Sequence, residues 1–152
     1  MTDPISFPST TARLGLPTLF VGQSQKEFFI NEAFARIDSL LHGTILGESA
    51  APAANPTEGD AWLIGASPTG GWADREGQIA AYQAGDWIYT APFDGMRLYD
   101  RSTGGTIFFK TSWQRIAPPG APVGGTTIDS EARVAIVNLI ETLASAGIFP
   151  AS

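Results

Sequence analysis

The chain has 152 residues, of which 43% are hydrophobic and 16% charged, so it is long enough for one domain and too short for two full domains. Its formal net charge of −6 argues against nucleic-acid binding, which depends on cationic side chains. The absence of cysteine excludes disulfides, thiolate catalysis and cysteine-bound zinc.

The N-terminal sequence does not resemble an export signal. Asp3, Pro4 and Pro8 stand where a signal peptide needs a basic start and an unbroken apolar run. The chain also lacks a continuous apolar stretch long enough to span a bilayer. We therefore expect a soluble protein with no membrane insertion.

Residues 1–22 are predicted to form an extended arm. Pro4, Pro8 and Pro17 interrupt any helix there, yet the segment carries enough Leu and Phe to pack on another surface. We expect the arm to contact a neighbouring protein.

A helix is predicted over residues 25–42. Ser24 and Glu27 have the spacing of a capping box, and Gly43 is placed to end the helix. Seven hydrophobic side chains form one stripe on the helical wheel, which we expect to face the domain's own core: Phe29, Ile30, Ala33, Phe34, Ile37, Leu40 and Leu41. Phe28 lies on the opposite side, and we predict that it contacts a partner.

Residues 44–116 have the pattern of antiparallel strands. Short runs of β-branched and aromatic residues alternate with Gly, Pro and Asp, and turn sequences such as Ala84-Gly85-Asp86 favour hairpins. Strands are predicted near 44–47, 60–65, 78–82, 86–91, 96–100, 106–110 and 113–116. The fold class is therefore α+β, mainly β: an antiparallel meander or sandwich packed by one N-terminal helix.

The C-terminal part is predicted to be a linker and a second helix. Residues 117–128 are rich in Pro and Gly, and residues 129–152 contain a helix of about 17 residues capped by Asp129 and ended by Gly147. Its apolar face is too wide for one contact, so we expect the helix to assemble with copies of itself. With Phe28, the predicted interface residues are Ile136, Val137, Ile140, Leu143 and Ala144. The helix-plus-β domain then spans residues 23–116.

No pattern of catalytic or metal-binding residues is present. The chain has one histidine, His42, which is suited to the end of the first helix, and its carboxylates do not form a recognisable acid pair. We expect no enzymatic activity, no metal and no cofactor.

The aromatic residues suggest a second kind of function. Flat aromatic faces can stack on sugar rings, and Trp72 lies in a Gly-rich loop. Alternatively, the tryptophans fill the core of a small sheet, which we expect above all for Trp62, Trp87 and Trp113. The candidates for carbohydrate binding are Trp72, Tyr82, Trp87 and Tyr99.

Several segments resemble a known family. They are Arg13-Leu14-Gly15-Leu16-Pro17, Gly22-Gln23-Ser24-Gln25-Lys26-Glu27, Asn31-Glu32-Ala33, Arg36-Ile37-Asp38, Pro56-Thr57-Glu58-Gly59-Asp60-Ala61-Trp62, Thr69-Gly70-Gly71-Trp72-Ala73, Gly77-Gln78-Ile79-Ala80 and Gly85-Asp86-Trp87. Over about residues 12–116 the chain resembles an uncharacterised domain family found in head-spike and tail-fibre proteins of alphaproteobacterial prophages and gene transfer agents. The family offers no catalytic residues to transfer.

The resemblance implies a structural subunit of a phage-like particle, assembled in the bacterial cytoplasm and released on lysis. Its partners would be copies of itself, as a trimer or a pentamer, and other capsid, spike or fibre proteins. The short C-terminal helix favours a base or adaptor role in attachment to cell-surface polysaccharide. The alternative is a carbohydrate-binding module that contacts the polysaccharide itself.

Overall fold

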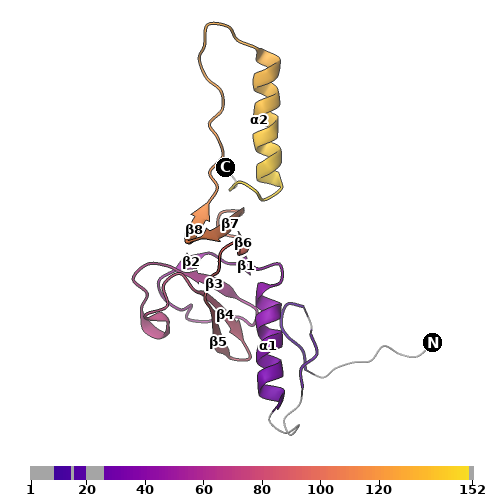
Figure 1. Cartoon of the computed structure of the whole chain (residues 1–152), viewed down its shortest axis with the longest axis vertical. Helices are drawn as coiled ribbons and strands as arrows, with labels where there is room; N and C mark the ends of the chain where they lie inside the picture. The colour runs from indigo at the N-terminus through magenta and orange to yellow at the C-terminus, as the bar shows by residue number, and fades with distance from the viewer. Residues whose placement is uncertain (1–8, 15, 20–25, 151–152) are drawn as a thin grey trace, which may run out of the picture. The chain divides into compact units, whose positions relative to one another are not determined.

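The computed structural model describes residues 9–14, 16–19 and 26–150. Within them, two α-helices and eight strands form an α+β fold with two sheets, which confirms the predicted class (Figure 1). The chain divides into two compact units, Met1–Pro92 and Phe93–Ser152. The predicted helix-plus-β domain of residues 23–116 therefore extends over both units.

The first unit contains helix α1 and five strands. In chain order they are α1 (Lys26–Leu40), β1 (Thr44–Ile45), β2 (Glu48–Ser49), β3 (Ala61–Ile64), β4 (Ile79–Gln83) and β5 (Asp86–Thr90), with a 3₁₀ turn, η1 (Gly70–Trp72), between β3 and β4. Strands β3, β4 and β5 are antiparallel, as predicted. Strand β2 was not predicted as an element of its own, and it pairs with β3 in parallel, so the expectation of antiparallel pairing is wrong at this edge.

Alternation along the strands gives this sheet two different faces. Ile64, Ala80 and Trp87 point to one face, where they surround the buried Trp72. Leu63 and Ala81 point to the other face, which α1 covers through hydrogen bonds to β4 and β5. The sheet thus separates an aromatic cluster from the helix.

The second unit contains strands β6 (Arg97–Asp100), β7 (Gly105–Lys110) and β8 (Ser112–Arg115), followed by helix α2 (Ser130–Ser145). The three strands form consecutive antiparallel hairpins. Leu98 and Ile107 are the buried hydrophobic residues of these strands, and Met96, just before β6, is buried too. Asp100 is buried beside them and accepts hydrogen bonds from Ser102 and Arg115.

Helix α2 is joined to these strands at its C-terminal end (Figure 1). The Thr106 hydroxyl donates to the Gly147 carbonyl at 2.7 Å. Gly105 lies so close to the chain after α2 that a Cβ there would be 2.8 Å from the Pro150 nitrogen. The small residue at position 105 therefore permits the C-terminal segment to lie on the β6–β7 hairpin.

Candidate assembly surfaces

The described part of the N-terminal arm packs on α1 of its own unit. Thr11 and Leu16 form a backbone hydrogen bond within the arm, and Asp38 of α1 accepts hydrogen bonds from the Thr11 hydroxyl at 2.8 Å and the Arg13 N–H at 2.9 Å. The arm was expected to reach a neighbouring protein. In residues 9–14 and 16–19 it packs on its own helix, and the contact with a neighbouring protein stays a prediction.

Asp38 is fully buried and surrounded by donors. Burial by itself would raise its pKa, but hydrogen bonds from Arg13, Thr11, Leu14 and Gln83 outweigh burial and lower the pKa below its ordinary value. The carboxylate therefore stays ionised and fastens the arm and strand β4 to α1.

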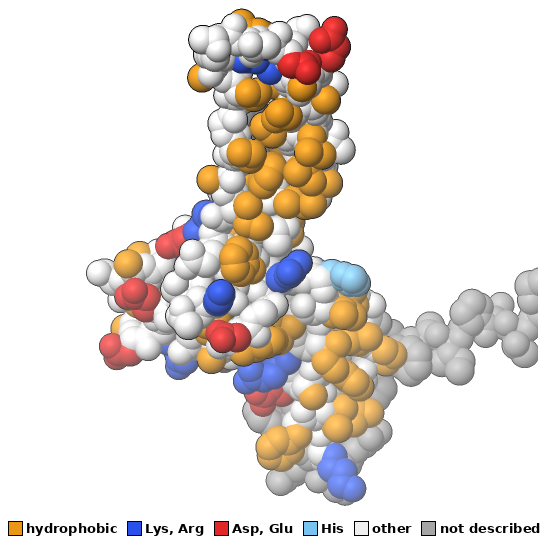
Figure 2. All heavy atoms as spheres, turned by 45° about the horizontal axis from the view of Figure 1, so that its top comes forward, with side chains coloured by type: hydrophobic (Ala, Val, Ile, Leu, Met, Phe, Trp, Pro, Cys, Tyr) orange, Lys and Arg blue, Asp and Glu red, His pale blue; other side chains and the backbone are white. Residues whose placement is uncertain are grey.

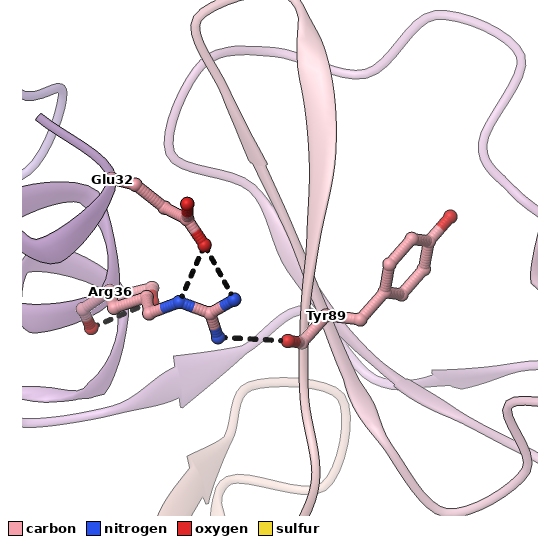
Figure 3. Close-up of polar contacts among 4 residues, drawn as sticks. Glu32, Arg36 and Tyr89 are labelled. Atoms are coloured by element: carbon pink, nitrogen blue, oxygen red, sulfur yellow. Dashed lines mark hydrogen bonds and ion pairs between the residues drawn. The ribbon is translucent and has the colours of Figure 1, made fainter. Parts of the chain in front are cut away.

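A second polar contact fastens α1 to the sheet. Arg36 binds the Glu32 carboxylate one turn earlier, at 2.8 Å, and donates to the Tyr89 carbonyl of β5 at 3.1 Å (Figure 3). The small side chains of Ala35 and Ser39 are buried on the same side of the helix. Polar and small residues thus make the contact between α1 and the rest of its unit.

The hydrophobic stripe of α1 consequently points outward. Phe29 is 72% exposed, and Ile30, Ile37 and Leu41 are 40% to 50% exposed. The prediction that this stripe faces the core is wrong, because hydrogen bonds of Asp38 and Arg36 hold the opposite side of the helix against the sheet and the arm. The side chain of Phe28, a predicted interface residue, lies outside the described residues.

Helix α2 has well-defined ends. Asp129 accepts a hydrogen bond from the Ala132 N–H at 2.8 Å, the N-cap that its sequence predicts. At the other end, the Gly147 and Ile148 N–H groups donate to the Ala144 and Leu143 carbonyls, and Gly147 has a φ of 70°. This is a Schellman motif, so the predicted C-terminal stop at Gly147 is confirmed.

One side of α2 lies toward the preceding linker. The Arg133 guanidinium donates to the Pro122 and Gly124 carbonyls. Val137, Ile140 and Ala144, which follow Arg133 along this side of the helix, are half-buried. These three predicted interface residues therefore have contacts within the chain.

The other side of α2 is uncovered. None of the 16 residues of α2 is buried, and Ile136 and Leu139 are 43% and 58% exposed. Figure 2 shows hydrophobic side chains gathered along α2. Of the predicted interface residues, Ile136 belongs to this uncovered side, whereas Leu143 is half-buried. Leu139 belongs to the uncovered side too, although it is not among the predicted interface residues.

The aromatic cluster of the first unit is mostly internal. Trp72 is fully buried, with its ring centre 5.1 Å from that of Trp87 in an edge-to-face arrangement. Tyr89 donates to the Gly71 carbonyl, and the Arg75 guanidinium stacks 3.8 Å from the centre of its ring. These contacts fold the Gly-rich loop over the sheet, so the expectation that Trp72 is exposed for stacking on a sugar is wrong.

The other carbohydrate-binding candidates are more accessible. Tyr82 and Trp87 are half-buried and pair across β4 and β5, with ring centres 5.2 Å apart. Tyr99 is 41% exposed and belongs to the second unit, where its ring packs beside Gly147. The structure therefore brings Trp72, Tyr82 and Trp87 into one cluster and leaves Tyr99 in a different unit.

Comparison with known proteins places the central part of the chain in a family. A family model described as "Protein of unknown function (DUF2793)" matches residues 30–115, more than half of the chain. The chain belongs to the DUF2793 family. A search of curated proteins found no match.

The DUF2793 match includes most of α1 and all eight strands of the described residues, but it ends before α2. Helix α2 therefore lies outside the matched residues. By contrast, most of the exposed stripe of α1, from Ile30 to Leu41, belongs to the DUF2793 domain itself.

The described residues contain no group of three or more metal-binding side chains. Neither described helix is long and apolar enough to cross a membrane.

His42, the single histidine, is exposed just after α1, and its carbonyl accepts a hydrogen bond from Arg13. His42 has a φ of 52°, so it takes the left-handed position at the helix end that was expected for Gly43.

Proposed function

We propose that this protein is a structural subunit of a phage-like particle, in the base or adaptor of a head spike or tail fibre. The observation that carries the proposal is the capped helix α2, which has no buried residue within its own chain. Such a helix is stable in a protein when its apolar side packs on something, so it is suited to assembly.

Two further features support an assembly role. The stripe of α1 is a second exposed apolar surface, and it lies on a different element from α2. Some of the sequence segments that resemble head-spike and tail-fibre proteins, among them Asn31-Glu32-Ala33, lie in α1. In this proposal, α2 joins copies of the chain, and α1 receives another capsid, spike or fibre protein.

The proposal is tested in particles released from the bacterium that encodes the chain. Particles purified on a density gradient are treated with an antibody against the chain and examined by immunogold electron microscopy. We expect gold at head vertices or at the tail tip. Its absence from intact particles that contain the other structural proteins would contradict the proposed function.

A second candidate is a carbohydrate-binding module for cell-surface polysaccharide. The exposed part of Tyr99 and the half-buried pair of Tyr82 and Trp87 favour it. Titration of capsular polysaccharide by calorimetry tests this candidate, with Tyr99→Ala and Trp87→Ala as variants. Binding that neither variant weakens would exclude these residues from a glycan site.

A further inference from the structure

Five residues along one side of α2, all of them exposed except the half-buried Leu143, follow a seven-residue repeat. Ala132, Ile136, Leu139, Leu143 and Ala146 are separated by alternating steps of four and three residues, and we call them the α2 seam. Spacing of this kind is typical of the a and d positions of a coiled coil, in which identical side chains meet across the interface. A helix that packs on the side of a sheet does not need such a strict repeat.

The charges around the seam also favour a second copy of the chain. Glu131 and Glu141 lie away from the seam on the helical wheel, so two seams can meet without bringing these carboxylates together. Arg133 lies beside the seam, as far from it as Glu131 is on the other side, and its guanidinium already binds the linker carbonyls of Pro122 and Gly124. Identical helices therefore meet through an uncharged surface.

The size of the side chains along the seam agrees with close packing of two helices. Alanine occupies both ends of the seam, and the larger Ile136, Leu139 and Leu143 occupy its middle. The side of α2 that carries Arg133 and Ile140 is already half-buried within the chain. Apart from the half-buried Leu143, the seam stays exposed for a partner helix.

We infer that the α2 seam binds the α2 seam of a second copy of the chain, with the two helices parallel. The direction rests on the proposed function, because copies arranged around the axis of a spike or fibre all point the same way. In a parallel pair, Ile136 contacts Ile136, Leu139 contacts Leu139 and Leu143 contacts Leu143 of the other copy.

Single-cysteine variants of the full chain test this arrangement, and the chain has no native cysteine to interfere. Ile136→Cys and Leu143→Cys are each oxidised separately, and the disulfide-linked dimer is measured by non-reducing electrophoresis. We expect both variants to form dimers efficiently. Ser145→Cys, on the opposite side of α2, is the matched control. It should form at least tenfold less disulfide-linked dimer than either seam variant.

Two results would overturn the inference. If the two helices were antiparallel, Ile136→Cys and Leu143→Cys would each form no disulfide-linked dimer alone. They would cross-link only when the two variants were mixed. If neither variant nor the mixture exceeds the Ser145→Cys control, and circular dichroism shows that the variants are folded, the seam does not bind a second copy. Detection of the chain in particles is independent of both results, so the proposed function can succeed or fail separately.

Discussion

Arg13 and Asp38 bind each other in both directions. The Arg13 backbone N–H donates to the Asp38 carboxylate at 2.9 Å, while the Arg13 guanidinium donates to the Asp38 backbone carbonyl at 2.8 Å. The same guanidinium also donates to the carbonyls of Ser39, in the last turn of α1, and His42, just after the helix. One residue of the arm therefore satisfies the last carbonyls of α1.

Arg13→Ala should destabilise the first unit. Three carbonyls at the end of α1 lose a charged donor. The bonds to Asp38 and Ser39 are partly buried, and a hydrogen bond to a charged group contributes about 1.5 to 3 kcal/mol. We expect the free energy of unfolding in urea to fall by about 2 kcal/mol. Arg101→Ala, at an exposed arginine, is the control. Equal stability of the two variants would contradict the role given to Arg13.

Asp38→Asn should change how stability depends on pH. Because the folded pKa of Asp38 is lowered, its contribution is complete above the ordinary carboxyl pKa of about 3.9 and is lost as the pH falls through the folded value. The variant should be less stable than the wild type at pH 6, and the difference should shrink toward pH 2. The difference in the free energy of unfolding is measured by urea denaturation across this pH range. Asp74→Asn, at an exposed aspartate, is the control. A constant difference at all pH values would show that Asp38 acts through its shape alone.

Gly105→Ala should loosen the attachment of α2. A methyl group at this position would be 2.8 Å from the Pro150 nitrogen and 3.0 Å from the Phe149 carbonyl carbon, so the C-terminal segment must move. We expect faster hydrogen exchange at residues 146–149 than in the wild type. Gly120→Ala has open space around the added methyl group and should leave exchange there unchanged. Unchanged exchange in Gly105→Ala would mean that the segment is attached elsewhere.

Trp72→Ala should unfold or severely destabilise the first unit. Removing a fully buried tryptophan typically costs about 3 to 5 kcal/mol, and Trp72 lies at the centre of the aromatic cluster. Thermal unfolding monitored by circular dichroism measures the loss, and Trp113→Ala, at a half-buried tryptophan of the second unit, provides a comparison. A Trp72→Ala variant as stable as the wild type would be inconsistent with the buried position.

Capsular polysaccharide incubated with the protein should remain intact. This expectation follows from the lone histidine, the absence of cysteine and the lack of a recognisable acid pair in the sequence. Size-exclusion chromatography of the polysaccharide before and after incubation is the measurement. Shortened chains would overturn the view that the protein is not an enzyme.

The sequence predicted the elements well because local signals mark their ends. Ala84-Gly85 has the positive φ values of a tight hairpin turn, and Asp129 and Gly147 cap α2 as expected. The short parallel strand β2 escaped prediction because its pairing with β3 depends on residues distant in the sequence. In a strand of two residues, an alternation of hydrophobic and polar side chains cannot be recognised in the sequence.

The orientation of α1 could not be predicted from its hydrophobic pattern. The pattern identifies an apolar side, but Asp38 and Arg36 decide which side meets the sheet, and their partners Thr11 and Tyr89 are far away in the sequence. Trp72 was misjudged for a similar reason. Glycine neighbours suggested an exposed loop, whereas the contacts with Trp87 and Ile64 that bury it exist only in the folded unit.

The mass of the full chain in solution tests the central claim most directly, namely that the uncovered side of α2 binds another copy. Light scattering coupled to size-exclusion chromatography should give a multiple of the 16.0 kDa chain mass at micromolar concentration. Leu139→Glu should reduce that mass to 16.0 kDa, because a carboxylate would be placed in the middle of the seam. Ser145→Glu, on the opposite side of α2, should leave the assembly intact. A wild-type chain that remains at 16.0 kDa at every concentration up to the millimolar range would contradict the claim.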